Sequence, residues 1–326
     1  MLFARRLGFV MLAVTVCGLA ASARASDGGA SFYLLGSGGP EVAVMPPLQG
    51  VYIDNTAFEY TGSAGANKQF DVAGNVVAGL KATTVADFPV FAWVPTTHFL
   101  GGTLMLGGAP IVVGAPIVNV SAILTGPLGR QVGFSRSDSA LMLADPIATA
   151  ALGWAQGNLH EQLSTTLNIP IGQYYPSQLA NISFHRWIDD VSLALTWHDA
   201  KTGWDLSGKA GVTFNGTNPT THYTTGTESH FEASLEKAVL PKLSAAVQAY
   251  YFYQLTGDSG PGDTLGPFKG RVTGVGGALS YDFKMGKMPA LLRARMMTEF
   301  GAINRLQGTS VWLELSVPLA VKLPRA

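Results

Sequence analysis

Cysteine and charged residues are scarce in this chain of 326 residues. The single cysteine is Cys17, so the rest of the chain can form neither a disulfide nor a thiolate zinc site. Charged residues make up 13% of the sequence, against ~25% in ordinary soluble domains. No excess of basic residues is gathered into a patch, so we expect no nucleic-acid partner.

A long helical membrane span is also missing, although residues 100–128 are apolar and no charged residue occurs between positions 88 and 129. Glycines and prolines interrupt this stretch and would break a helix of ~20 residues. They favour two or three short strands facing lipid, with Trp93 and Phe99 at the membrane interface. A buried parallel sheet would also have apolar strands, but it needs crossover helices, and no amphipathic helical segment is evident.

The N-terminus has the features of a secretory signal peptide. Arginines at positions 5 and 6 precede an apolar stretch that ends at the small-residue triplet Ala23-Arg24-Ala25. We predict cleavage after Ala25, which leaves residues 26–326 as one mature domain. The 21 basic residues less the three in the leader leave 18 against 21 acidic ones, a net charge of about −3.

The residues between 201 and 300 alternate between apolar and polar in successive runs separated by Gly, Pro, Asn and Asp. In the run Trp204–Asn215, Leu206 and Phe214 share one face while Asp205 and Lys209 share the other. Comparable alternation occurs at 227–237 and 292–300. The polar face of such strands looks outward in a soluble sandwich and inward in a transmembrane barrel, so periodicity alone leaves both open.

Compartment and composition together favour the barrel. The fold class predicted is all-β, an antiparallel transmembrane β-barrel of the outer-membrane type with roughly 12 strands. Polar connections at 215–226 and 257–270 are expected to be extracellular loops, and residues 27–48 to be an irregular segment that could plug the lumen. Strands are predicted near 50–60, 72–86, 90–100, 102–113, 117–125, 140–152, 158–169, 190–199, 204–215, 227–238, 243–255, 271–283, 290–301 and 310–321.

Motifs spread over nearly the whole mature chain resemble the outer-membrane family named for the meta-pathway of phenol degradation. The N-terminal motif is Gly36-x-Gly38-Gly39 followed by Pro46-Pro47-x-x-Gly50-x-Tyr52-x-x-Asn55. Further matches in the same order include Asp145-Pro146, Leu152-Gly153-Trp154, His160, Pro170-x-Gly172-x-Tyr174, Ala180-Asn181, Asn215-x-x-Asn218-x-x-Thr221-x-Tyr223-x-x-Gly226, His230, Gln254-x-x-Gly257-Asp258, Gly270-Arg271, Glu299-Phe300, Asn304-Arg305 and Trp312.

This resemblance implies a barrel in the bacterial outer membrane that passively admits small hydrophobic or aromatic compounds, with no catalytic residues and no cofactor. Its expected partners are outer-membrane lipid, lipopolysaccharide, the barrel assembly machinery and the solutes themselves. The C-terminus departs from the usual pattern, because it ends on Ala326 rather than on an aromatic residue. The alternation over 312–321 still predicts a closing strand.

Residues on the polar face of the strands are the candidates for any chemistry in the lumen. One interpretation is a structural network of ion pairs that fills a narrow barrel. The other is that Lys209, Arg293 and Arg295 orient the polar end of an aromatic acid or phenol while aromatic side chains stack on its ring. The complete set of lumen and substrate-path candidates is Asp205, Lys209, Glu228, His230, Glu232, Tyr250, Phe252, Arg293, Arg295, Glu299 and Trp312.

Two other classes of function are weaker alternatives. A purely structural or adhesive barrel would have long external loops, and those here are modest. A lipid hydrolase at the barrel rim would need a Ser or Thr nucleophile beside a histidine base. The histidines available as bases are His160, His185, His198, His222 and His230, and no two of them show a recognised metal-ligand spacing.

Overall fold

A computed structural model describes residues 23–25, 29–65, 68–72, 74–125, 131–176, 178–286 and 288–322. Most of the predicted leader, with Cys17, therefore lies outside the described residues, as does the end of the chain beyond 322. All elements assigned within the described residues are β-strands. No helix in this part of the chain is long and apolar enough to cross a membrane.

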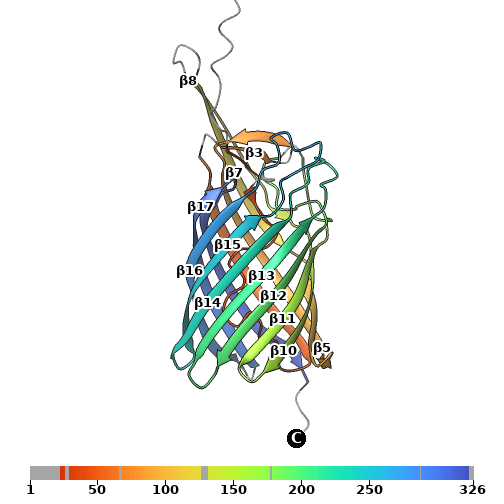
Figure 1. Cartoon of the computed structure of the whole chain (residues 1–326), viewed down its shortest axis with the longest axis vertical. Coiled ribbons are helices and arrows are strands. Elements are labelled where there is room, and N and C mark those ends of the chain that lie inside the picture. Colours follow the sequence, from red (N-terminus) through yellow and green to blue (C-terminus); the bar gives the residue numbers. More distant parts are fainter. Residues whose placement is uncertain are drawn as a thin grey trace, which may run out of the picture.

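Twelve strands of the described residues close into an antiparallel barrel (Figure 1). They are β2 (Gly50–Ser63), β5 (Lys81–Phe99), β6 (Gly102–Ala109), β10 (Ile147–Gln156), β11 (Leu159–Asn168), β12 (Ile188–Asp199), β13 (Trp204–Asn215), β14 (Glu228–Leu240), β15 (Leu243–Gln254), β16 (Arg271–Met285), β17 (Met288–Ile303) and β18 (Gln307–Val321). β2 pairs with β18 on one side and β5 on the other, which closes the barrel. The predicted fold class and strand number are confirmed.

Six further strands of the described residues lie outside this ring. They are β1 (Ala23–Ala25), β3 (Lys68–Val72), β4 (Asn75–Ala78), β7 (Val113–Thr125), β8 (Gln131–Ser139) and β9 (Met142–Leu143). β7 pairs with the first part of β5, and the β7–β8 hairpin rises above the barrel rim (Figure 1). β1 pairs with β3 in parallel, and it falls within the predicted leader.

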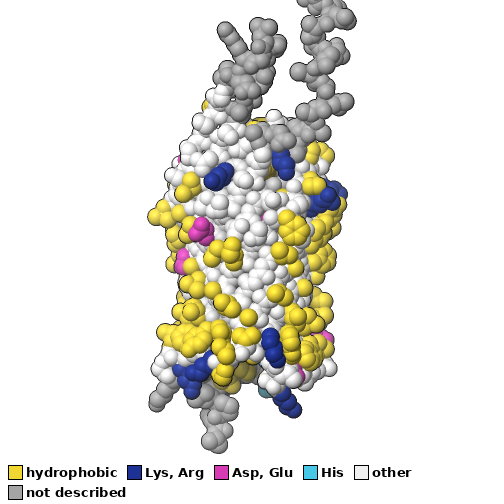
Figure 2. Space-filling view, turned by 90° about the vertical axis from the view of Figure 1, so that its left-hand side faces the viewer, with side chains coloured by type: hydrophobic (Ala, Val, Ile, Leu, Met, Phe, Trp, Pro, Cys, Tyr) yellow, Lys and Arg dark blue, Asp and Glu magenta, His cyan; other side chains and the backbone are white. Residues whose placement is uncertain are grey.

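Alternation of side chains explains why these strands form a membrane wall. On β17, Met296 is 54% exposed and its neighbour Arg295 is 3% exposed. On β14, Phe231 and Leu235 are exposed while Glu232 and Glu236 are buried. Figure 2 shows hydrophobic side chains over much of one outer face, gathered in a band near its lower end. The apolar face meets lipid and the polar face lines the interior.

The two ends of the barrel differ. The long connections at 169–187, 216–227 and 255–270 gather at the end from which β7 and β8 project, and short turns close the opposite end (Figure 1). This asymmetry is typical of outer-membrane barrels, whose longer loops are extracellular. A cluster of buried apolar residues from the long-loop end caps the mouth; it includes Phe70, Leu80, Val120, Leu179 and Leu306.

Two stretches differ from the predicted strands. The strands predicted at 72–86 and 90–100 are wrong, because β5 runs without interruption through Pro89, which pairs with Asn55 of β2. A proline lacks a backbone N–H, so it fits a strand wherever the ladder does not use that donor. The strand predicted at 140–152 is also wrong, because the chain forms β9, turns, and starts β10 at Ile147. β8 was not predicted.

Candidate functional site

The N-terminal segment at 29–49, called the plug here, lies inside the barrel between the mouth and the start of β2. Its strongest anchor is the carboxylate of Glu232 on β14, which accepts hydrogen bonds from the backbone N–H groups of Gly36 at 2.7 Å and Gly38 at 2.6 Å. A Cβ atom added at Gly38 would lie 2.6 Å from the Glu232 Oε2 atom. Glycine is therefore required for this close approach of backbone and carboxylate.

Further contacts tie the lower part of the plug to the wall. The backbone N–H of Glu41 donates to Asp205 at 3.2 Å and to Ser207 at 3.0 Å. The N–H of Ala43 donates to Thr196 on β12 at 3.1 Å. These are bonds from plug backbone to wall side chains, so the segment is docked in the lumen and adds no strand to the wall.

An apolar cluster joins the upper part of the plug to the wall. Tyr33 and Leu35 of the plug pack with four wall residues, Tyr250, Phe252, Val272 and Met297. The Tyr33 ring also stacks on His230, with 3.4 Å between ring centroids, and the Lys209 ammonium lies 4.8 Å from the same ring. The lumen is therefore not uniformly polar, because the plug covers an aromatic patch on β15 and its neighbours.

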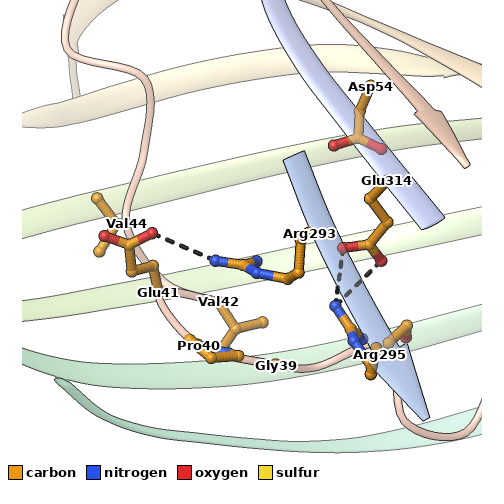
Figure 3. A pocket seen from close by; sticks show the side chains of 10 residues that line it. Gly39, Pro40, Glu41, Val42, Val44, Asp54, Arg293, Arg295 and Glu314 are labelled. Carbon is orange, nitrogen blue, oxygen red and sulfur yellow. Dashed lines mark hydrogen bonds and ion pairs between the residues drawn. The ribbon is translucent and has the colours of Figure 1, made fainter. Parts of the chain in front are cut away.

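A polar cavity of about 370 Å³ lies beside the plug, against β17, β18 and β2 (Figure 3). Arg293 reaches Glu41 of the plug with 3.5 Å between Nη2 and Oε2. Arg295 donates to both oxygens of Glu314, at 3.0 and 2.9 Å. The lining residues are Ser37, Gly39, Pro40, Glu41, Val42, Val44, Asp54, Arg293, Arg295 and Glu314.

A second cavity, of about 530 Å³, is largely apolar and lies at the junction of β5, β6 and β10. Trp93 and Leu106 line it across a cross-strand pair, and both are exposed. Pro110 and Ile147 line it as well, next to the glycines at positions 107 and 108. The β5–β6 ladder shifts register on either side of Thr96, so the wall is least regular here.

The structure brings together some of the candidate residues and separates others. Arg293 and Arg295 line the polar cavity, and Trp312 packs beside Arg295 with 5.3 Å between guanidinium and ring. Tyr250 and Phe252 instead belong to the aromatic patch, and Lys209 faces Tyr33. The sequence predicts three cations around one site for an aromatic ring. The structure instead divides these residues between two places in the lumen.

The remaining candidates take part in buried hydrogen bonds. Glu299 accepts from the phenols of Tyr60 at 2.8 Å and Tyr250 at 3.0 Å. Glu228 is fully buried and accepts from Asn215 at 3.4 Å. His198 lies 3.2 Å from Asp205.

A serine, a histidine and an aspartate meet inside the barrel, but not as a catalytic triad. Asp190 and Ser192 both approach the same ring nitrogen of His230, Nε2, at 3.0 and 3.4 Å. In a triad the acid and the nucleophile contact opposite ring nitrogens. Among the described residues the Nδ1 atom of His230 has no hydrogen-bond partner, and the ring is covered by Tyr33 rather than placed at a rim. No cluster of potential metal ligands occurs in the same part of the chain.

Several residues of the site escape sequence reasoning. Asp54 and Glu314 share the lumen-facing phase of β2 and β18, so a full periodicity analysis of these strands would find them. Tyr33, Leu35 and Glu41 lie in an irregular segment with no periodicity. Only the glycine motif at positions 36, 38 and 39 marks that segment, and its reason is the approach to Glu232.

Over residues 66–315 the sequence matches the family described as "Putative MetA-pathway of phenol degradation". The chain belongs to that family. The match covers most of the barrel of this phenol-degradation family member and confirms the resemblance found in the sequence motifs. No curated protein matches the sequence.

Solved structures are similar to this phenol-degradation family member in fold. A crystal structure of an outer membrane channel from Pseudomonas putida F1 superposes with a TM-score of 0.63 and 15% identity, over 85% of this chain and 98% of that one. A FadL homologue from Pseudomonas aeruginosa has a TM-score of 0.39 and 10% identity, over 86% of this chain and 93% of that one. The first of these establishes an outer-membrane barrel fold.

Proposed function

We propose that this protein is a passive route for small hydrophobic or aromatic compounds through the bacterial outer membrane, and that the plug is displaced as they pass. The aromatic patch in the lumen carries this proposal. Tyr33 and Leu35 of the plug occupy the patch formed by Tyr250, Phe252 and Met297. When the plug withdraws, an aromatic solute can take the same contacts.

The contacts that hold the plug are individually weak enough for a solute to replace some of them. Burying a side chain such as Leu35 stabilises by about 1.5–3 kcal/mol, and a hydrogen bond to a charged group by about the same amount. The plug is therefore held by several contacts of this size and by no strand pairing, so a solute that takes over part of them offsets the cost of plug movement. The second, largely apolar cavity at the junction of β5, β6 and β10 gives an apolar solute another surface on the same barrel.

Uptake by intact cells tests the function. Cells with and without the gene would be given labelled toluene, phenol, benzoate, a fatty acid and a small sugar. We expect gene-dependent uptake of the aromatic compounds and no effect on the sugar. Equal uptake of every compound with and without the gene would overturn the proposal and leave a structural role for the barrel.

Two neighbouring residues on β15 allow the aromatic patch to be tested separately from the outer wall of the barrel. Phe252 faces the lumen and is buried, whereas Tyr251 faces outward and is exposed. We expect Phe252→Ala to lower the ratio of toluene uptake to sugar uptake several-fold, because the patch loses one of its two wall rings, and Tyr251→Ala to leave this ratio unchanged. The ratio is the useful measure, because a looser plug alone would raise uptake of both compounds.

A further inference from the structure

Glu41 of the plug is placed differently from the other carboxylates of the polar cavity. Its backbone is held at φ 60° in the turn of the plug, and its N–H is bonded to Asp205 and Ser207 on one side of the lumen. Its carboxylate points into the cavity and reaches Arg293 (Figure 3). The Glu41 side chain is 37% exposed and that of Arg293 is 11% exposed.

The two arginines of the cavity are paired in unequal ways. Arg295 and its partner Glu314 both belong to the wall, and Arg295 contacts both carboxylate oxygens at about 3 Å. Arg293 is fixed by its Nε donating to Ser280 at 2.9 Å, and its Nη2 meets Glu41 at 3.5 Å. A partly exposed ion pair at this distance contributes at most about 1 kcal/mol, whereas a bidentate pair is stronger. The Arg293 guanidinium therefore holds its present carboxylate weakly.

The charges around this position favour a monoanion. Three carboxylates (Glu41, Asp54 and Glu314) and two arginines line the cavity. Asp54 is satisfied by the hydroxyls of Thr56 and Ser316, and Glu314 by Arg295. If Glu41 leaves Arg293, an incoming carboxylate restores the charge beside the Nη2 atom, while a neutral molecule leaves that end of the guanidinium without a carboxylate; the Nε end stays bonded to Ser280. The side chains of Pro40, Val42 and Val44 provide apolar contacts next to it.

We propose that Arg293 forms a subsite for a small aromatic carboxylate and that Glu41 of the plug is its resident occupant, so that binding of the solute releases the lower turn of the plug. This inference deepens the proposed function and rests on it for the passage of aromatic solutes. It adds a substrate class, aromatic monoanions, and a means by which they loosen the plug. The cavity volume, about 370 Å³, lies within the range of small-molecule sites.

Planar bilayer recordings of the purified full chain test the subsite. The probes are benzoate and its neutral counterpart benzyl alcohol. In the unmodified protein we expect benzoate to raise the frequency of channel opening several-fold and benzyl alcohol to have no such effect. Glu41→Gln should open frequently without benzoate and respond little to it. Arg293→Gln should not respond to benzoate.

Controls keep the outcome clear. Glu59→Gln removes an exposed carboxylate on the lipid-facing side of β2 and should behave like the unmodified protein. If Arg293→Gln does not assemble, Arg293→Lys retains the charge without the two-pronged guanidinium and should show a weakened response. Equal responses to benzoate and benzyl alcohol, or an undiminished response in both Arg293 variants, would overturn the subsite.

The subsite and the proposed function can fail separately. Toluene carries no charge, so its uptake by cells reports on the channel alone. Gene-dependent uptake of toluene together with an Arg293-independent response to benzoate would reject the subsite and keep the channel. An Arg293-dependent response in bilayers without gene-dependent uptake of any aromatic compound would support the subsite and reject the uptake function.

Discussion

At the scale of single residues, one carboxylate fixes the upper plug. Glu232 is buried and accepts the two N–H groups of Gly36 and Gly38, so its removal leaves both donors without their acceptor. Losing hydrogen bonds to a charged group costs about 1.5–3 kcal/mol each. This single side chain therefore supplies two of the bonds that hold the plug in place.

We expect Glu232→Ala to make the plug more accessible from the water-filled ends of the barrel. Because the predicted mature chain has no cysteine, Ser37→Cys provides a single labelling site within the plug. Maleimide labelling of this cysteine should be faster in the protein that also carries Glu232→Ala than in the protein that retains Glu232. Glu59→Ala, which removes an exposed carboxylate, serves as the control and should leave the labelling rate unchanged. Equal labelling rates with and without Glu232→Ala would contradict the role of Glu232 as an anchor of the plug.

At the scale of elements, periodicity predicts the strands that have lipid on one face and the polar lumen on the other. β13 is predicted at its observed bounds, and β14 and β17 within a few residues of theirs. Periodicity does not predict the strands where this alternation stops. β5 passes through Pro89, and β8, which has no predicted counterpart, pairs only with β7 beyond the wall, where neither face is defined by lipid.

The last strand, β18, closes the barrel against β2. β18 pairs with β2 along its length, and a register shift occurs between Pro318 and Ala320. Leu319 is 48% exposed on the outer wall. We expect replacement of Leu319 and Val321 together by Asp to abolish assembly, because charge would be placed on the lipid-facing end of the closing strand. Heat-modifiable migration in gels checks this, and normal migration of the double variant would count against the role of β18 in assembly.

One aspartate organises a long loop at the end of the barrel from which β7 and β8 project. Asp145 precedes β10 and accepts hydrogen bonds from Asn168, Ser183 and the backbone N–H groups of residues 172, 184 and 185. We expect Asp145→Ala to free the loop at 169–187 while the barrel persists, because these donors lose their common acceptor. Limited proteolysis should cut this loop faster in the variant. Unchanged protection of the loop would show that other contacts suffice.

At the scale of the whole molecule, sequence patterns identify the barrel but not the contacts inside it. The bonds between the plug and Glu232 join residues almost 200 positions apart, and no periodic signal links such positions. The glycine motif indicates that the backbone comes close to something, but not to what. The division of the candidate residues between an aromatic patch and a polar cavity likewise depends on where the plug lies.

The plug is separable from the wall, and this leads to a final prediction. Every residue of β2 pairs with both β5 and β18, and the register shift skips only Leu319 of β18, so the barrel closes without any residue of 29–49. Deleting residues 30–48 should therefore give a barrel that still assembles and shows heat-modifiable migration. Its lumen would be lined by the polar side chains of β12 to β17 and filled with water, so single-channel conductance should rise several-fold and the small sugar should now pass.

A deletion variant that assembles but conducts like the unmodified protein would mean that the wall side chains, rather than the plug, block the lumen. A variant that does not assemble would mean that the plug is part of the folding core, because its bonds to Glu232, Asp205 and Thr196 connect three neighbouring strands.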